Sequence, residues 1–148
     1  MAARADFYMI AGKAQFVEQP LLLVCQLAVK ALAANQPCLI FCESAEQAEF
    51  LDDLLWDFDD DAFVPHQIVA DDEEDADENE EITPVLLVPP GVETPMRSLV
   101  INLRNDLPPP GYARVLEIVP ADESAREPAR KRWLEYKKLG FELKRNDM

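Results

Sequence analysis

Short apolar runs and stretches with apolar residues at helical spacing alternate along the first part of the chain. The segment 6–10 and the continuous apolar run 37–42 predict two strands, the second buried on both faces. Between them, Pro20 opens a run to Ala34 that is rich in Leu and Ala, which favours a helix. The pattern therefore begins with a strand, a helix and a second strand.

A second helix follows the second strand. Ser44 and Gln47 have the spacing of a capping box, and the helical pattern runs to about Trp56. Its apolar positions recur at helical spacing: Ala48, Leu51, Leu54 and Leu55. Acidic residues occupy the remaining face, so we expect a half-buried helix.

The second half contains three strand candidates, 85–88, 98–102 and 114–119, separated by Pro-rich turns. A last helix is predicted from about Pro128 to Leu139, with Gly140 as a left-handed cap and a short extension after it. Its start is open, because Ser124 and Glu127 have capping-box spacing while Pro128 suits a first turn. We predict one α/β domain over residues 1–148, with a mostly parallel sheet flanked by helices.

Two segments interrupt this pattern. Residues 62–66, Ala-Phe-Val-Pro-His, predict a loop with an apolar tip because Pro65 breaks regular structure there. Residues 71–81 hold nine acids in eleven positions, a density typical of a mobile, solvated loop.

The net charge of -15 opposes general attraction to nucleic acid or to anionic membranes. No apolar stretch is long enough to span a bilayer, and no secretory signal opens the chain, so we expect a cytoplasmic protein. Cys25, Cys38 and Cys42 lie within apolar segments, which suits reduced, buried thiols.

Candidate catalytic chemistry is sparse. Gly12 alone follows the first strand, and neither of the glycine-rich phosphate-binding motifs occurs, so the sheet is predicted to be Rossmann-like without a nucleotide-binding loop. Cys25, Cys38, Cys42 and His66 have unusual spacing for a zinc site, and His66 has no identifiable nucleophile partner. We expect no cofactor, no metal and no enzymatic activity.

A basic segment near the C-terminus contrasts with the rest of the chain. Between Arg126 and Arg145, eight bases face three acids, a net charge of +5 against -20 elsewhere. At helical spacing Arg126, Arg130 and Trp133 share one side, an arrangement suited to an acidic peptide with an apolar end. The alternative is that Trp133 belongs to an apolar core stripe and the bases only form the solvated face.

Several short motifs, specific only in combination, resemble the χ (chi) subunit of the bacterial DNA polymerase III holoenzyme, a clamp-loader component. They are Phe7-Tyr8, Cys42-Glu43 followed by Glu46-Gln47-Ala48, Leu55-Trp56, Phe63-Val-Pro-His66, Val119-Pro120, and Arg130-x-Arg132-Trp133-x-x-Tyr136-x-x-x-Gly140-Phe141. Pro128 and Leu134 depart from the family pattern.

The resemblance implies a noncatalytic replication adaptor that joins the clamp loader to the acidic C-terminal tail of single-stranded DNA-binding protein. It implies a tail-binding pocket at Val119, Arg126, Arg130 and Trp133. It also implies a surface for the psi subunit at Trp56, Phe63, Val64 and Pro65. A repair helicase as the second partner, and direct binding of single-stranded DNA, stay open as alternatives.

Overall fold

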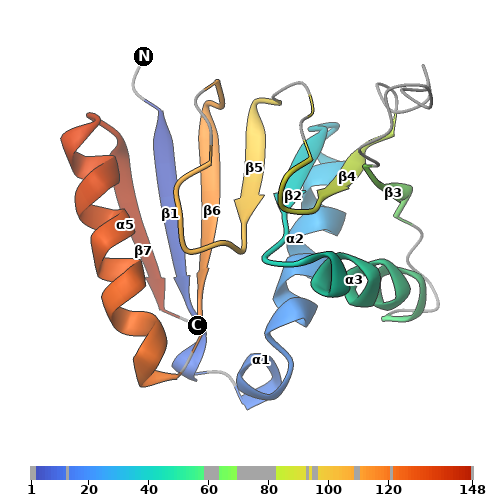
Figure 1. The fold of residues 1–148 in the computed structure, drawn as a ribbon, viewed down its shortest axis with the longest axis horizontal. Helices are drawn as coiled ribbons and strands as arrows, with labels where there is room; N and C mark the ends of the chain where they lie inside the picture. The colour runs from blue at the N-terminus through green and yellow to red at the C-terminus, as the bar shows by residue number, and fades with distance from the viewer. Residues whose placement is uncertain are drawn as a thin grey trace.

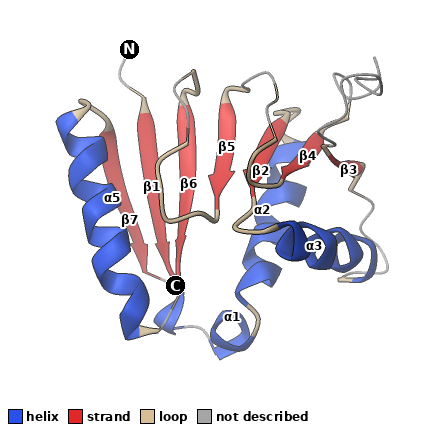
Figure 2. Ribbon diagram, in the orientation of Figure 1, coloured by secondary structure: helices blue, strands red, loops and turns tan. Residues whose placement is uncertain are grey.

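The computed structural model describes residues 3–12, 14–58, 64–69, 83–92, 94, 97–108, 111–120 and 122–147. Within those ranges, seven strands form one sheet in the order β3-β4-β2-β5-β6-β1-β7, and each neighbouring pair is parallel (Figure 2). The strands are β1 (Arg4–Met9), β2 (Cys38–Phe41), β3 (His66–Ile68), β4 (Val85–Val88), β5 (Leu99–Asn102), β6 (Arg114–Val119) and β7 (Glu142–Asp147). The predicted α/β fold with a parallel sheet is confirmed.

The helices flank the sheet, with one at each end and the others between them (Figure 1). They are α1 (Ala14–Glu18), α2 (Pro20–Ala33), α3 (Ala45–Asp57) and α5 (Arg126–Lys138), with 3-10 turns η1 (Ile10–Gly12) and η3 (Glu123–Ala125). In Figure 1, α5 lies beside β7 and β1, whereas α3 lies near β4 and β3. Two surfaces formed by these helices are therefore far apart in the fold.

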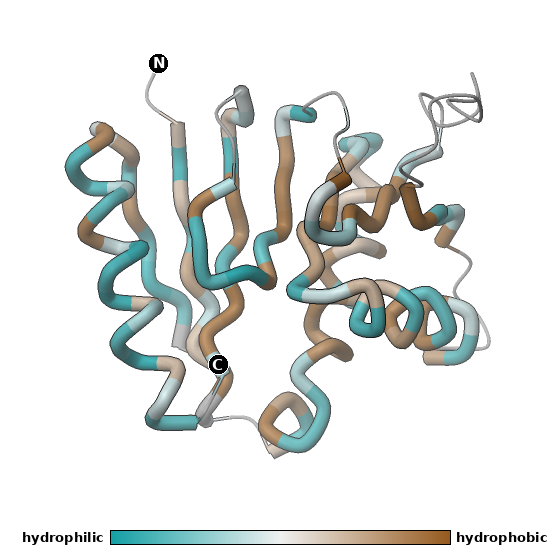
Figure 3. The backbone as a smooth tube through the Cα atoms, in the orientation of Figure 1, coloured by the Kyte–Doolittle hydropathy of each residue, from teal (hydrophilic) through white to brown (hydrophobic). Residues whose placement is uncertain are grey.

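Each face of the sheet has its own apolar core, and β2 contributes to both. Cys38 and Ile40 pack with α2 and α3, whereas Leu39 and Phe41 belong to the cluster that includes α5. In Figure 3 the middle strands, such as β5, are mainly brown, whereas α3 and α5 carry many hydrophilic residues. The continuous apolar run of β2 reflects burial on both faces, as the sequence predicts.

The predicted helix ends are largely confirmed. The Gln47 amide donates to Ser44 Oγ at 3.0 Å, while Gln47 Oε1 accepts from the Glu43 amide at 2.6 Å, one residue earlier than in a standard capping box. Gly140 has φ +86°, and the Phe141 amide donates to the Tyr136 carbonyl at 3.0 Å. These contacts close α5 with a Schellman motif.

The start of α5 favours one of the two predicted alternatives. The helix begins at Arg126, and Pro128 is its third residue, where the backbone N–H has no partner within a helix. No side chain caps this helix; instead Asp122 accepts from the Ser124 amide at 3.0 Å and caps the preceding 3-10 turn. The Ser124 and Glu127 capping box is wrong.

Two strands were not predicted, and both lie at the edges of the sheet. His66 was assigned to a loop because of Pro65, but it opens the edge strand β3, where a preceding proline removes no ladder bond. The extension after Gly140 is the polar strand β7, which pairs with β1. Phe63 and the acidic segment 71–81 lie outside the described residues.

The three cysteines make stability depend on pH. They are free and buried, and burial raises the pKa of each thiol to about 12. Unfolded thiols ionise near their ordinary pKa of about 8.5, so above that pH the unfolded state loses protons that the folded state keeps. We predict that the free energy of unfolding, measured in urea, falls as pH rises from about 8 to about 10.

The control is the variant in which Cys25, Cys38 and Cys42 are all alanine. Its stability should fall less steeply over the same pH range. Equal slopes in the two proteins would contradict the assignment.

Candidate functional site

A buried carboxylate joins the last helix to the sheet. Glu117, in the middle of β6, is fully buried, and its Oε1 accepts from Arg132 Nε of α5 at 2.9 Å. Its Oε2 accepts from the Tyr136 hydroxyl at 2.6 Å and from Asn102 Nδ2 at 2.7 Å. Asn102 is the register neighbour of Glu117 on β5. One side chain thus ties α5 to two strands.

Opposing electrostatic effects act on the pKa of Glu117 and of its partner Tyr136. Burial raises the pKa of Glu117, while the charge of Arg132 and the hydrogen bonds from Asn102 and Tyr136 oppose that shift by stabilising the carboxylate. Burial and the neighbouring Glu117 also raise the pKa of Tyr136, so its hydroxyl remains a donor. The three partners all donate to Glu117, as an ionised carboxylate requires.

The outer side of α5 carries the predicted cations. Arg126 and Arg130 are exposed, four residues apart on the helix. Trp133 is half-buried, and its ring lies edge-on to Phe7 with centroids 5.1 Å apart. Val119 is only 1% exposed and belongs to the same apolar cluster. Trp133 thus packs inward in part, as the core interpretation predicts, and its remaining exposed part leaves the role in a peptide pocket as a prediction.

Sequence reasoning missed the division of roles within the basic segment. Arg132 is one of the eight bases of this segment, but it is only 5% exposed and so does not belong to the solvated face. The signal was present, because Arg132 falls between the buried Ala129 and Tyr136 at helical spacing, and Glu117 is a lone acid in an apolar strand. Leu134, half exposed one turn after Arg130, was also not expected to add apolar surface there.

The second predicted surface lies on α3 and the residues before β3. Trp56 is 56% exposed, and its ring centroid lies 5.0 Å from that of His66. Two contacts hold the His66 ring in place. Its Nδ1 lies 2.6 Å from the Val64 carbonyl, and its Nε2 lies 3.0 Å from Asp52 Oδ1. Val64 is only 2% exposed and belongs to the apolar core, and Pro65 is half-buried, so Trp56 is the one largely exposed member of this predicted surface among the described residues.

Phe50, 61% exposed on α3, is an aromatic surface residue that the sequence interpretation did not single out. Within the described ranges, no group of three or more His, Cys, Asp or Glu residues is placed to hold a metal ion. In the same part of the chain, no helix is long and apolar enough to cross a bilayer.

Comparison with known proteins decides the family. A family model described as DNA polymerase III chi subunit, HolC, matches residues 2–144. The chain belongs to the DNA polymerase III chi subunit family. The chi subunit of Pseudomonas aeruginosa is 34% identical over 145 residues, covering 95% of this chain and 93% of the relative. That of Haemophilus influenzae is 26% identical over 146 residues, covering 97% and 96%.

Among solved structures, the C-terminal domain of the DEAD-box protein Dbp5 matches with a TM-score of 0.67. The match covers 99% of this chain and 91% of that one at 15% identity, so it shows the shared fold alone.

Two of the motifs that carry the chi resemblance, Phe7-Tyr8 and the one from Arg130 to Phe141, meet at α5, whereas Glu46-Gln47-Ala48 and Leu55-Trp56 lie on α3. Phe7 contacts both Trp133 and Tyr136, with ring centroids 5.1 and 6.0 Å apart, and Tyr136 contacts Phe141 at 5.0 Å. Pro128 departs from the chi pattern without cost to the helix, since it stands in the first turn. These two motifs therefore supply the aromatic contacts between the last helix and the sheet.

The buried pair predicts strong energetic coupling. Glu117→Leu and Arg132→Met should each cost about 3–5 kcal/mol of unfolding free energy, because each leaves a buried charge unpaired. The double variant should cost clearly less than the sum of the two. Urea denaturation of the four proteins measures this cycle, and Glu135→Leu, at an exposed position of α5, should change stability by less than about 0.5 kcal/mol. Additive losses would contradict the pairing.

Proposed function

We propose that this chain is a noncatalytic adaptor of the DNA polymerase III holoenzyme, acting in the cytoplasm. It links the clamp loader, through the psi subunit, to the acidic C-terminal tail of single-stranded DNA-binding protein. The observation that carries the proposal is the outer side of α5, where the exposed Arg126 and Arg130 adjoin the half-buried Trp133 on a chain of net charge -15. Membership of the chi family supports the same role.

In the proposed complex, the two guanidinium groups take carboxylates of the tail. Exposed charge-assisted contacts of this kind draw an acidic peptide to one local patch, while the acidic remainder of the chain discourages binding to nucleic acid. The terminal apolar side chain of the tail contacts the accessible part of Trp133, supported from beneath by the buried Val119. Leu134 offers further apolar surface one turn from Arg130.

This proposal is tested with a labelled acidic peptide that ends in an apolar residue. Arg130→Ala should weaken its binding about tenfold or more in fluorescence anisotropy, because one ion pair with the peptide is lost. Affinity should also fall as salt rises. Lys131→Ala, an equal change of charge about 100° around the same helix, should change the affinity less than about twofold.

Equal affinity of the wild type and Arg130→Ala would overturn the site. Tight binding of a bare oligonucleotide at physiological salt would favour direct single-stranded DNA binding instead.

The proposed psi surface comprises Trp56, Phe63, Val64 and Pro65, and among its described members Trp56 is the largely exposed one. An exposed Trp that rests on a fixed neighbour is suited to a partner contact, because its ring is already oriented and contributes a large apolar area. This surface and α5 lie at opposite ends of the sheet (Figure 1), which suits simultaneous binding of two partners.

Trp56→Ala should weaken binding of a purified psi subunit by at least tenfold in calorimetry, while peptide binding at α5 stays unchanged. Phe50→Ala removes an equally exposed aromatic side chain from a different side of α3 and should leave psi binding intact. Unchanged affinity of Trp56→Ala for psi would contradict the proposal. If psi does not bind the wild type but a repair helicase does, the alternative partner is favoured.

A further inference from the structure

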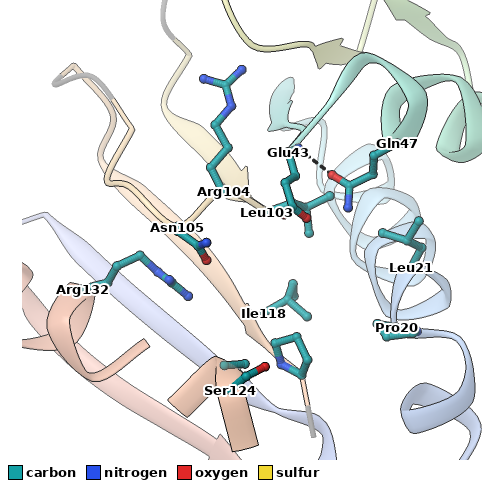
Figure 4. Close-up of a pocket in the computed structure, with 12 residues that line it drawn as sticks. Pro20, Leu21, Glu43, Gln47, Leu103, Arg104, Asn105, Ile118, Ser124 and Arg132 are labelled. Atoms are coloured by element: carbon teal, nitrogen blue, oxygen red, sulfur yellow. Dashed lines mark hydrogen bonds between the residues drawn. The ribbon is translucent and has the colours of Figure 1, made fainter. Parts of the chain in front are cut away.

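A pocket of about 370 Å³ opens at the carboxyl edge of the sheet, away from the outer side of α5. It lies where β2, β5 and β6 end and where α2 and α3 begin (Figure 4). Glu43 follows β2, Leu103 follows β5, Pro120 follows β6, and Pro20 is the first residue of α2. In open parallel sheets, the crevice at this edge is the usual place for a small ligand.

One buried donor of this pocket has no partner among the residues that the structure describes. The Arg132 guanidinium points from α5 into the pocket (Figure 4), and its side chain is only 6% exposed. Nε donates to Glu117, but Nη1 makes no hydrogen bond to any described residue. Buried guanidinium donors are normally satisfied, so this atom marks a position for a hydrogen-bond acceptor.

The other walls restrict the kind of molecule that fits. Leu21, Leu103 and Ile118 provide apolar surface, while Gln47 and Ser124 add neutral polar groups. A second arginine, Arg104, also lines the pocket, but two of its three guanidinium nitrogens already have partners. Nε and Nη2 donate to the Cys42 and Val88 carbonyls at 2.8 and 2.9 Å. Figure 4 shows its guanidinium directed away from the other labelled residues.

Charge sets a further limit. Arg132 is paired with Glu117, and Glu43 also lines the pocket. The Glu43 carboxylate would repel a polyanion such as a nucleoside triphosphate, and the net charge of -15 would oppose its binding further.

We propose that this pocket binds a small organic acid through one carboxylate or phosphate group, with its apolar part against Leu103 and Ile118. The acid group accepts from Arg132 Nη1, which completes the hydrogen bonding of the guanidinium. The site is separate from the proposed peptide surface, because Arg126 and Arg130 are exposed on α5 whereas Arg132 is buried against the sheet.

The test uses the full chain labelled with ¹⁵N and three probes with the same alkyl chain: hexanoate, hexyl phosphate and hexanol. At least one acid should give saturable shifts at the Arg132 Nε–H and at the amides of Leu103 and Ile118, and the neutral alcohol should bind at least tenfold more weakly. The two acids together distinguish a carboxylate ligand from a phosphate ligand. A saturating acidic peptide should leave these shifts unchanged.

Gln47→Glu provides a variant that keeps the fold, since a glutamate oxygen can still accept from the Glu43 amide at the start of α3. This change places a negative charge in the pocket and should lower the affinity for the two acids about tenfold or more. Gln26→Glu adds the same charge at an exposed position of α2 and should have little effect. The inference is overturned if neither acid gives saturable shifts, if hexanol binds as well as the acids, if Gln47→Glu binds them normally, or if the acidic peptide displaces them.

Discussion

The buried carboxylate of Glu117 is the constraint on which the rest of the structure depends. It can be buried only because Arg132, Tyr136 and Asn102 donate to it, and two of these belong to α5. That requirement fixes the rotation of the helix about its own axis. With Arg132 and Tyr136 turned inward, Arg126 and Arg130 must face solvent. The same interaction thus stabilises the fold and determines which cations are available to a partner.

The fold also separates the two proposed partner surfaces. Helices α3 and α5 lie at opposite ends of one continuous sheet, and they pack on two different apolar cores. A rigid parallel sheet between them keeps their distance constant, which is what a bridge between two proteins requires. Each proposed surface has a tryptophan that contacts a neighbouring ring: Trp56 contacts His66, and Trp133 contacts Phe7. In both places the aromatic residue is oriented before a partner arrives.

The central strands and the long helices could be predicted from the sequence because their apolar residues are continuous or periodic, as in 85–88 and 114–119. The edge strands could not, since β3 is only three residues long and β7 is the polar segment Glu142–Asp147. The cations of α5 were found from charge, but the burial of Arg132 depends on Glu117, fifteen residues earlier in the chain. Helical spacing and the lone acid of β6 indicate two inward-facing charges, but that these two pair with each other is seen only when the helix is packed on the sheet. The pocket beside Arg132 was missed for the same reason.

Helix α5, held by Glu117, is proposed to present its outer side to an acidic peptide, and the proposed adaptor role depends on this contact. The most direct measurement is a titration of the ¹⁵N-labelled chain with that peptide, followed residue by residue. We expect the shifts to concentrate at Arg126, Arg130 and the Trp133 indole, while the signals of the Arg132 Nε–H and of Trp56 remain unchanged. Shifts centred on α3, or none at α5 with saturating peptide, would contradict this proposal.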